Sequence, residues 1–203
     1  LACLYNLSLF MEAKIMKMAK KLLAVVLTGV MAVSMLTGCA SVSSRQVADE
    51  LQGMLKAVND KATVKAVNDD LANKAVKAAK NTDGSLKADN TLKTDVETEL
   101  KKDVAKDTYV WYTLVETKDL NKTTKAQKIA KALITIENQS AKINTAGAVN
   151  SADVKVDDKS GDAIKAGNKF ELSMKEFSVG SGSAKKDYVM VVVTCKAVVK
   201  AAG

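Results

Sequence analysis

Side chains that could carry catalysis are scarce in this sequence. It contains no histidine, so the residue most often used for proton transfer near neutral pH, and the commonest metal ligand, is missing. Its three cysteines are Cys3, Cys39 and Cys195. A nucleophile of the Cys/His type is therefore excluded, and acid–base chemistry would have to come from carboxylates.

Three carboxylates cluster at Asp157, Asp158 and Asp162. Two carboxyl groups that converge in a cleft, one of them with a strongly shifted pKa, can act as the acid and base of a hydrolase. The same stretch also has the composition of a hairpin turn, which is the alternative interpretation. A carboxylate-dependent hydrolase therefore stays among the candidate functions.

The segment Asn81-Thr82-Asp83-Gly84-Ser85-Leu86 resembles the middle of a calcium-binding EF-hand loop, with oxygen ligands at alternating positions and a glycine at the sharp turn. The resemblance makes Asn81 and Asp83 candidate metal ligands. The pattern departs at both ends, because Ala79 takes the first ligand position and Asn90 replaces the bidentate glutamate. A plain turn is the alternative.

Tyr109 and Trp111 are the candidate ligand-binding aromatics. They lie in the expected strand from Thr108 to Val115, whose alternation puts both on one face. They could line a groove or pack in the core. We expect no cofactor, because the sequence has neither a phosphate-binding P-loop nor a dinucleotide fingerprint. We expect no nucleic-acid partner either, with aromatic residues at only 4%.

Residues 16 to 38 have the organisation of an export signal. A short positive run, Met16 to Lys21, precedes an apolar stretch from Leu22 to Met35 that is short for a membrane-spanning helix. The positive charge holds the N-terminal side in the cytoplasm while the remainder crosses. Leu36-Thr37-Gly38-Cys39 follows, and then a small, mostly polar segment from Ala40 to Ser44.

This arrangement resembles the lipobox of bacterial lipoprotein precursors. Leu36 matches the apolar position, Thr37 and Gly38 match the small residues, and Cys39 matches the obligatory cysteine. In that family the thiol receives a diacylglyceryl group and signal peptidase II cuts in front of it. The resemblance therefore implies a protein held by its lipid on the extracytoplasmic face of the cell membrane. The alternative is that the apolar stretch is a buried core helix.

The domain organisation follows from that cleavage site. We interpret residues 1–15 as an upstream extension, 16–38 as the signal peptide, 39–44 as lipidated cysteine and tether, and 45–203 as one domain. Cleavage leaves 165 residues, enough for a single core, and lowers the formal net charge from +8 to +5. This excess weakly favours an anionic surface, such as phospholipid or wall polymer. It also leaves Cys195 as the only unmodified thiol, which excludes a disulfide framework.

Within the domain we expect helices first and a sheet last. Residues 45–80 favour helix, with a break near Asn59 to Thr63, because a nine-residue repeat of Lys-Ala-Val-Asn-Asp would turn the apolar side by about 180° along one helix. Asn90 is expected to cap a further helix, whose apolar face holds Leu92, Val96, Leu100 and Val104 at four-residue spacing.

Most of the remaining chain is expected to form strands, with a weak helix from Thr123 to Ala132 and a strand from Leu133 to Glu137. Alternating residues from Phe170 onward and a Val-rich run from Tyr188 to Val199 predict a final strand pair. The Val-rich strand is expected to be buried on both faces over part of its length. The sum is an α+β fold: N-terminal helices followed by a mainly antiparallel sheet that ends in a C-terminal β-hairpin.

The leading functional hypothesis is a non-catalytic binding or interaction domain at the cell envelope. Its expected partners are the membrane, through the N-terminal lipid, and a protein or an anionic envelope polymer. The alternatives are the carboxylate-dependent hydrolase and a small-solute-binding lipoprotein, although 165 residues are few for the usual two-lobed receptor.

Overall fold

The computed structural model describes residues 42–117, 120–121, 123–137 and 140–201. The predicted signal peptide and the lipobox, including Leu36, Thr37, Gly38 and Cys39, lie outside these residues.

One four-stranded sheet organises the described chain, with strand order β1-β7-β8-β2. β1 runs parallel to β7, and the other two pairings are antiparallel. The strands of this sheet are β1 (Thr63–Ala66), β2 (Thr108–Glu116), β7 (Ile164–Val179) and β8 (Lys186–Val199). The α-helices are α2 (Ser44–Lys56), α3 (Asp70–Ala79), α4 (Asp89–Asp103) and α5 (Lys125–Lys131). Two small ribbons pair β3 (Thr135–Glu137) with β4 (Ser140–Lys142) and β5 (Lys155–Val156) with β6 (Lys159–Ser160).

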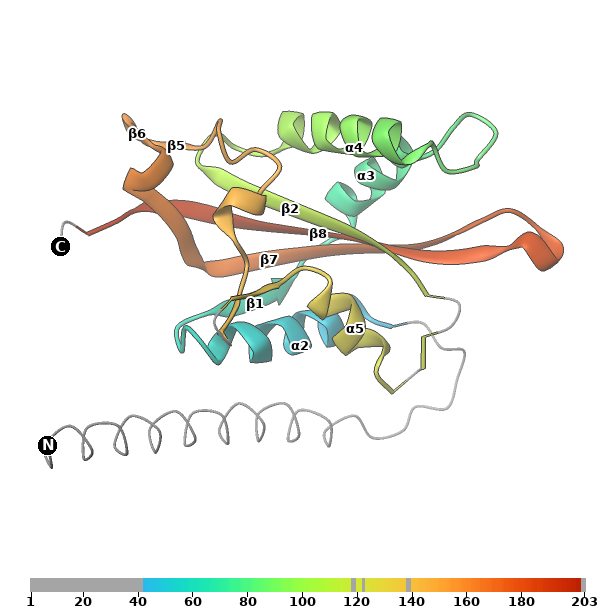
Figure 1. Cartoon of the computed structure of the whole chain (residues 1–203), viewed down its shortest axis with the longest axis horizontal. Helices are drawn as coiled ribbons and strands as arrows, with labels where there is room; N and C mark the ends of the chain where they lie inside the picture. Colours follow the sequence, from blue (N-terminus) through green and yellow to red (C-terminus); the bar gives the residue numbers. More distant parts are fainter. Residues whose placement is uncertain (1–41, 118–119, 122, 138–139, 202–203) are drawn as a thin grey trace, which may run out of the picture. The chain divides into compact units, whose positions relative to one another are not determined.

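The helices cover the sheet on both faces, with α2 and α5 on one side and α3 and α4 on the other (Figure 1). Alternate residues of β8 divide between the two cores. Val191 and Val193 pack toward α2 and α5, whereas Met190 and Val192 pack toward α3 and α4. The α+β prediction and the prediction of a final strand buried on both faces are confirmed.

Helix α2 begins at a capping box immediately after Val42. The Ser43 hydroxyl accepts a hydrogen bond from the Gln46 backbone N–H at 3.2 Å, and the Gln46 side chain accepts one from the Ser43 N–H at 3.0 Å. These bonds satisfy donors that a helix start leaves open. Because Val42 is itself buried, the folded domain begins within the segment expected to serve as tether.

The expectation of two helices over residues 45–80, divided only by a break, is wrong at its centre. The break near Asn59 to Thr63 is confirmed, but it leads into strand β1, where Val64 pairs with Phe170 and Ala66 with Leu172. These partners lie more than 100 residues away, and pairing with them overrides the local helix preference. Val58 follows the end of α2 and is 49% exposed.

The predicted cap of α4 is also wrong. Ala88 takes the N-cap position, and Asn90 lies inside the helix. The Ala88 carbonyl accepts the Leu92 N–H at 2.8 Å, so the first turn closes two residues earlier than expected, without a side-chain cap. The predicted apolar face is confirmed, because Leu92, Val96 and Leu100 are buried.

The C-terminal hairpin is confirmed and extends past the helices. From Phe170↔Cys195 to Val179↔Lys186 the pairing of β7 with β8 is unbroken. Its turn lies at one extreme of the domain, at the right of Figure 1. Gly180 opens the turn with φ of 80°, and a Cβ there would meet the Ala184 carbonyl oxygen at 2.7 Å, so glycine is required.

Candidate functional site

The three candidate carboxylates of a hydrolase lie on the surface. Asp157 and Asp158 form the two-residue turn between β5 and β6, and Asp157 adopts φ of 53°. Asp162 lies in a short 3-10 helix just beyond β6, and all three are exposed. They therefore form a hairpin turn and its continuation. These residues do not form the pair of carboxylates converging in a cleft that would favour the hydrolase alternative.

A different carboxylate, Glu50 on α2, has a raised pKa. Burial is the largest cause, the neighbouring Asp49 charge adds to it, and Lys131 opposes it. Glu50 is half-buried, and it is absent from the lining of the pocket described below. The sequence gives no signal for it, because burial depends on α5 packing alongside α2.

The candidate metal ligands Asn81 and Asp83 take part in a self-contained turn. Asp83 Oδ1 accepts hydrogen bonds from the Ser85 backbone N–H at 2.9 Å and the Ser85 hydroxyl at 2.6 Å. These bonds, the side-chain one first, lower the pKa of Asp83. The Asn81 amide nitrogen donates to Ser85 Oγ and to the Leu86 carbonyl.

The conformation of the turn accounts for these residue types without a cation. Gly84 has φ of 84°, and Lys80 bridges to Leu86 across the turn. Among the residues that the structure describes, no group of three or more histidine, cysteine, aspartate or glutamate side chains could hold a metal ion.

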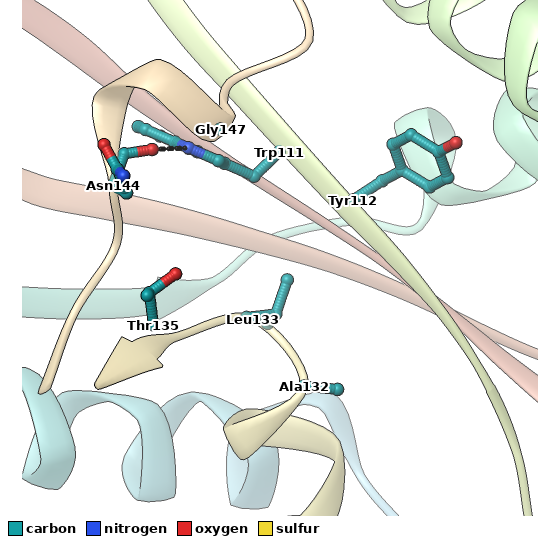
Figure 2. Close-up of a pocket in the computed structure, with 7 residues that line it drawn as sticks. All are labelled: Trp111, Tyr112, Ala132, Leu133, Thr135, Asn144 and Gly147. Carbon is teal, nitrogen blue, oxygen red and sulfur yellow. Dashed lines mark hydrogen bonds between the residues drawn. The ribbon is translucent and has the colours of Figure 1, made fainter. Parts of the chain in front are cut away.

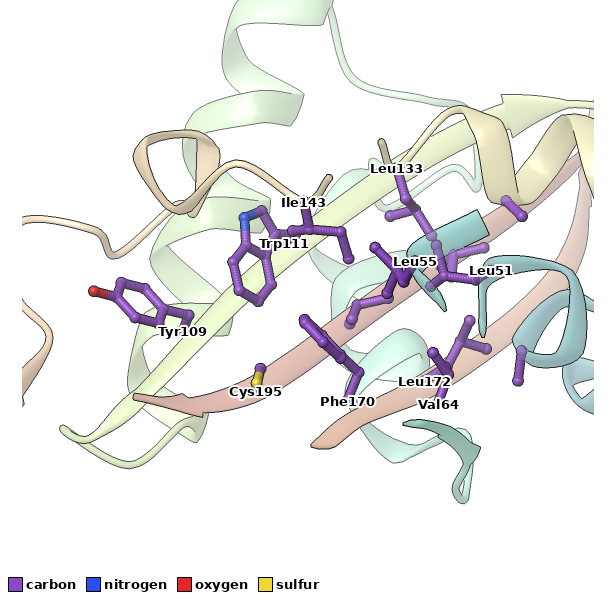
Figure 3. Packing of buried hydrophobic residues seen from close by; sticks show 14 of the residues in the cluster. Leu51, Leu55, Val64, Tyr109, Trp111, Leu133, Ile143, Phe170, Leu172 and Cys195 are labelled. Carbon is purple, nitrogen blue, oxygen red and sulfur yellow. The ribbon is translucent and has the colours of Figure 1, made fainter. Parts of the chain in front are cut away.

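Tyr109 and Trp111 share one face of β2, as expected, and both are nearly buried, at 3% and 5% exposure. Their ring centroids lie 5.8 Å apart, and Trp111 lies 6.3 Å from Phe170 on β7. Figure 3 shows these rings beside Cys195 in the core under α2. Most of both aromatic surfaces is therefore used in packing, and burial raises the pKa of the Tyr109 hydroxyl.

A small open pocket of about 160 Å³ remains beside Trp111. It is lined by residues of β2, the α5–β3 connection, the start of β3 and the segment after β4: Trp111, Tyr112, Ala132, Leu133, Thr135, Asn144 and Gly147. Figure 2 shows the Tyr112 ring directed away from the others, toward the side of the sheet that carries α3 and α4. Tyr112 therefore contributes mainly backbone to the pocket.

The chemistry of this pocket is that of a shallow binding surface. Its lining carries no charged side chain, and the Trp111 indole N–H already donates to the Asn144 carbonyl at 2.9 Å. Its volume is below the roughly 300–1,000 Å³ of usual small-molecule sites. The residues present could contact an apolar side chain of a partner, but they supply no acid, base or nucleophile.

The pocket lies along edge strand β2, whose outer side is covered by the Asn150 side chain and by the Val149 N–H, which donates to the Val110 carbonyl at 2.9 Å. Asn150 Oδ1 accepts the Val110 N–H at 3.1 Å, and its amide nitrogen donates to the Thr108 carbonyl at 2.7 Å. Asn150 thus replaces a neighbouring strand over this part of β2. Nothing in its sequence context distinguishes it from other loop asparagines.

Cys195 is a free, buried thiol. Burial in the apolar core is the largest cause that raises its pKa to about 11. A thiol with that pKa stays protonated at neutral pH and is a poor nucleophile. The side chain is therefore structural, as the absence of histidine led us to expect.

The start of the folded chain is hydrogen-bonded to β7 near the turn of the hairpin. The Val42 backbone N–H donates to Glu176 Oε1 at 3.1 Å, and Lys125 Nζ of α5 lies 3.6 Å from the same oxygen. Val42 and Glu176 are 134 residues apart, so no local pattern could reveal this contact. It fixes the place where the segment after Cys39 enters the domain.

No protein-family model, curated protein or solved structure matches this chain. Within the described part of the chain, no helix combines the length and apolar character needed to cross a membrane.

Proposed function

We propose that this protein is a lipid-anchored, non-catalytic interaction domain of the bacterial cell envelope. Its anchor is a diacylglyceryl group on Cys39, and its α+β domain meets its partner through surface contacts. The lipobox-like sequence Leu36-Thr37-Gly38-Cys39, placed directly after a basic run and an apolar stretch, carries the proposal.

The position of the fold relative to that cysteine supports the anchor. The capping box at Ser43 starts α2 only four residues after Cys39. Cleavage before Cys39 would therefore keep every residue of the described domain, which starts at Val42.

Three features support a non-catalytic role. The candidate carboxylates lie exposed at a turn, the thiol of Cys195 is buried with a raised pKa, and the pocket beside Trp111 has no charged lining. The small volume of that pocket favours contact with a macromolecule over enclosure of a solute.

Replacement of the anchoring residue tests the localisation. We expect Cys39→Ser to abolish incorporation of labelled fatty acid and to leave the precursor uncleaved or released from the membrane, because a hydroxyl cannot replace the thiol acceptor. Cys3→Ser is the matched control, since that cysteine lies in the part to be removed. Unchanged labelling and membrane retention in Cys39→Ser would refute the anchor.

Affinity capture of the detergent-solubilised native protein tests the interaction role. One partner recovered at constant stoichiometry, and lost when Thr135→Asp or Gly147→Asp alters the exposed lining of the pocket, supports the proposal. Recovery of the same partner with those variants would place the contact elsewhere, and turnover of an envelope substrate by the pure protein would overturn the non-catalytic assignment.

A further inference from the structure

The short chain between Cys39 and the domain limits how the domain can sit on a membrane. Cys39 and Val42 are separated by three residue steps, which span at most about 11 Å when fully extended. Val42 is buried and hydrogen-bonded to Glu176, so it belongs to the folded domain and does not lengthen the tether. A lipid on Cys39 would therefore hold Glu176 close to the bilayer surface.

Glu176 lies near one end of the long hairpin. Gly180 lies four residue steps further on, which corresponds to about 14 Å of strand. We name residues 180–186, which join β7 to β8, the hairpin tip. The hairpin tip therefore begins about 14 Å beyond Glu176, a length similar to the roughly 11 Å of the extended tether.

The body of the domain extends in the opposite direction. Helix α2 starts beside Glu176, and the chain after its end meets β7 at the Asn59–Asn168 hydrogen bond of 2.8 Å. The β5–β6 turn, which holds Asp158, lies at the end of the domain far from the hairpin tip (Figure 1). With the hairpin axis perpendicular to the bilayer, so short a tether places the hairpin tip toward the membrane and the β5–β6 turn away from it.

The hairpin tip has the charge that a lipid surface attracts. From Gly180 to Lys186 it carries Lys185 and Lys186 and no acidic residue, and Asp187 follows directly on β8. The two lysine side chains are 53% and 55% exposed, and their contacts with Asp187 and Glu116, at 3.4 and 3.2 Å, are surface ion pairs. Such pairs are weak and exchange readily for other anions.

We propose that the hairpin tip is the membrane-facing end of the domain, with Lys185 and Lys186 against the phosphate groups of anionic lipid headgroups. This inference rests on the proposed Cys39 anchor. Each lysine near an anionic surface raises the affinity for the membrane by roughly fivefold. Two lysines are therefore enough to orient the domain, but the lipid is needed to keep it at the membrane.

Position-specific quenching tests the orientation. The lipidated mature protein is placed in vesicles of phosphatidylglycerol and phosphatidylethanolamine that contain a lipid with a quenching headgroup. Fluorophores are attached to Ser183→Cys or, as the matched control turn, to Asp158→Cys. Lipidation occupies Cys39 and Cys195 is buried, so each variant offers one accessible thiol. We expect several-fold stronger quenching at residue 183, whereas equal quenching or stronger quenching at 158 would overturn the orientation.

Charge removal tests the lipid contact. The pair Lys185→Gln with Lys186→Gln should reduce quenching at residue 183 in anionic vesicles to the level seen with neutral phosphatidylcholine. Lys155→Gln with Lys159→Gln, at the opposite turn, should change nothing. Equal quenching on both lipids, insensitive to the tip lysines, would overturn the phosphate contact. Flotation of the same samples separates the two proposals, since a protein that does not float with the vesicles lacks the anchor itself.

Discussion

Cys195 links one buried side chain to the pH dependence of stability. Its pKa rises from an ordinary 9.0 to about 11 because the thiolate would be desolvated in the folded state. The unfolded chain therefore loses its proton at a lower pH than the folded one, so this group stabilises the fold below pH 9 and the contribution disappears as the pH rises to about 11.

We predict that, between pH 9 and 11, the free energy of unfolding falls by up to roughly 3 kcal/mol more in the native chain than in Cys195→Ala. Tyr109 and Tyr112 also have raised pKa values, but both variants retain them. Urea unfolding followed by fluorescence of Trp111, the single tryptophan, measures the difference. Parallel pH curves for the two proteins would contradict the assignment.

Asn150 carries a second residue-scale prediction. Its side chain satisfies the Val110 N–H and the Thr108 carbonyl at the edge of β2. We expect Asn150→Ala to lower the free energy of unfolding by about 2–3 kcal/mol, because two backbone groups lose their partner in a buried place. Asn168→Ala, which removes one exposed side-chain bond, is the control and should cost less than about 0.5 kcal/mol. A similar loss in both variants would argue against the bridging role.

At the scale of elements, the sequence predicts the helices and strands that carry a long, regular pattern of apolar residues. The Val-rich β8 and the apolar spacing of Leu92, Val96 and Leu100 are of this kind, and both are confirmed. The sequence did not predict strand β1, because four residues are too few to show an alternating pattern. The strand forms only through its pairing with β7, for example Val64↔Phe170.

The candidate site shows the same limit. Sequence predicts that Tyr109 and Trp111 share a face of β2, because strand alternation is local. It cannot predict that Leu133 and Asn144 meet Trp111 to form the pocket, since three separate segments converge there. The contact of Val42 with Glu176 is hidden for the same reason.

Helix α2 gives the prediction at this scale. Leu51 is fully buried against the sheet, whereas Val58, just past the helix, is 49% exposed. We expect Leu51→Ala to lower the free energy of unfolding by about 2–5 kcal/mol through lost apolar contact and a remaining cavity. Val58→Ala should stay within about 0.5 kcal/mol. Chemical denaturation of both variants checks this, and a small effect at Leu51 would mean that α2 does not pack as described.

At the scale of the whole molecule, the folded domain begins only a few residues after the proposed lipidation site, Cys39. The capping box at Ser43 and the Val42–Glu176 bond leave few residues between the proposed lipid and the sheet. With Cys39 lipidated, as proposed, the domain would lie close to the membrane surface with the hairpin tip nearest to it. An envelope partner would then be met by the remaining faces of the domain.

The chemical identity of the mature N-terminus tests this account most directly. The protein is purified from the membrane fraction of its native cells, and its N-terminal peptide is examined by mass spectrometry. We predict a chain that begins at Cys39 and carries a diacylglyceryl group on that thiol. A chain that begins elsewhere, or an unmodified Cys39 in the membrane-bound protein, would contradict the central claim.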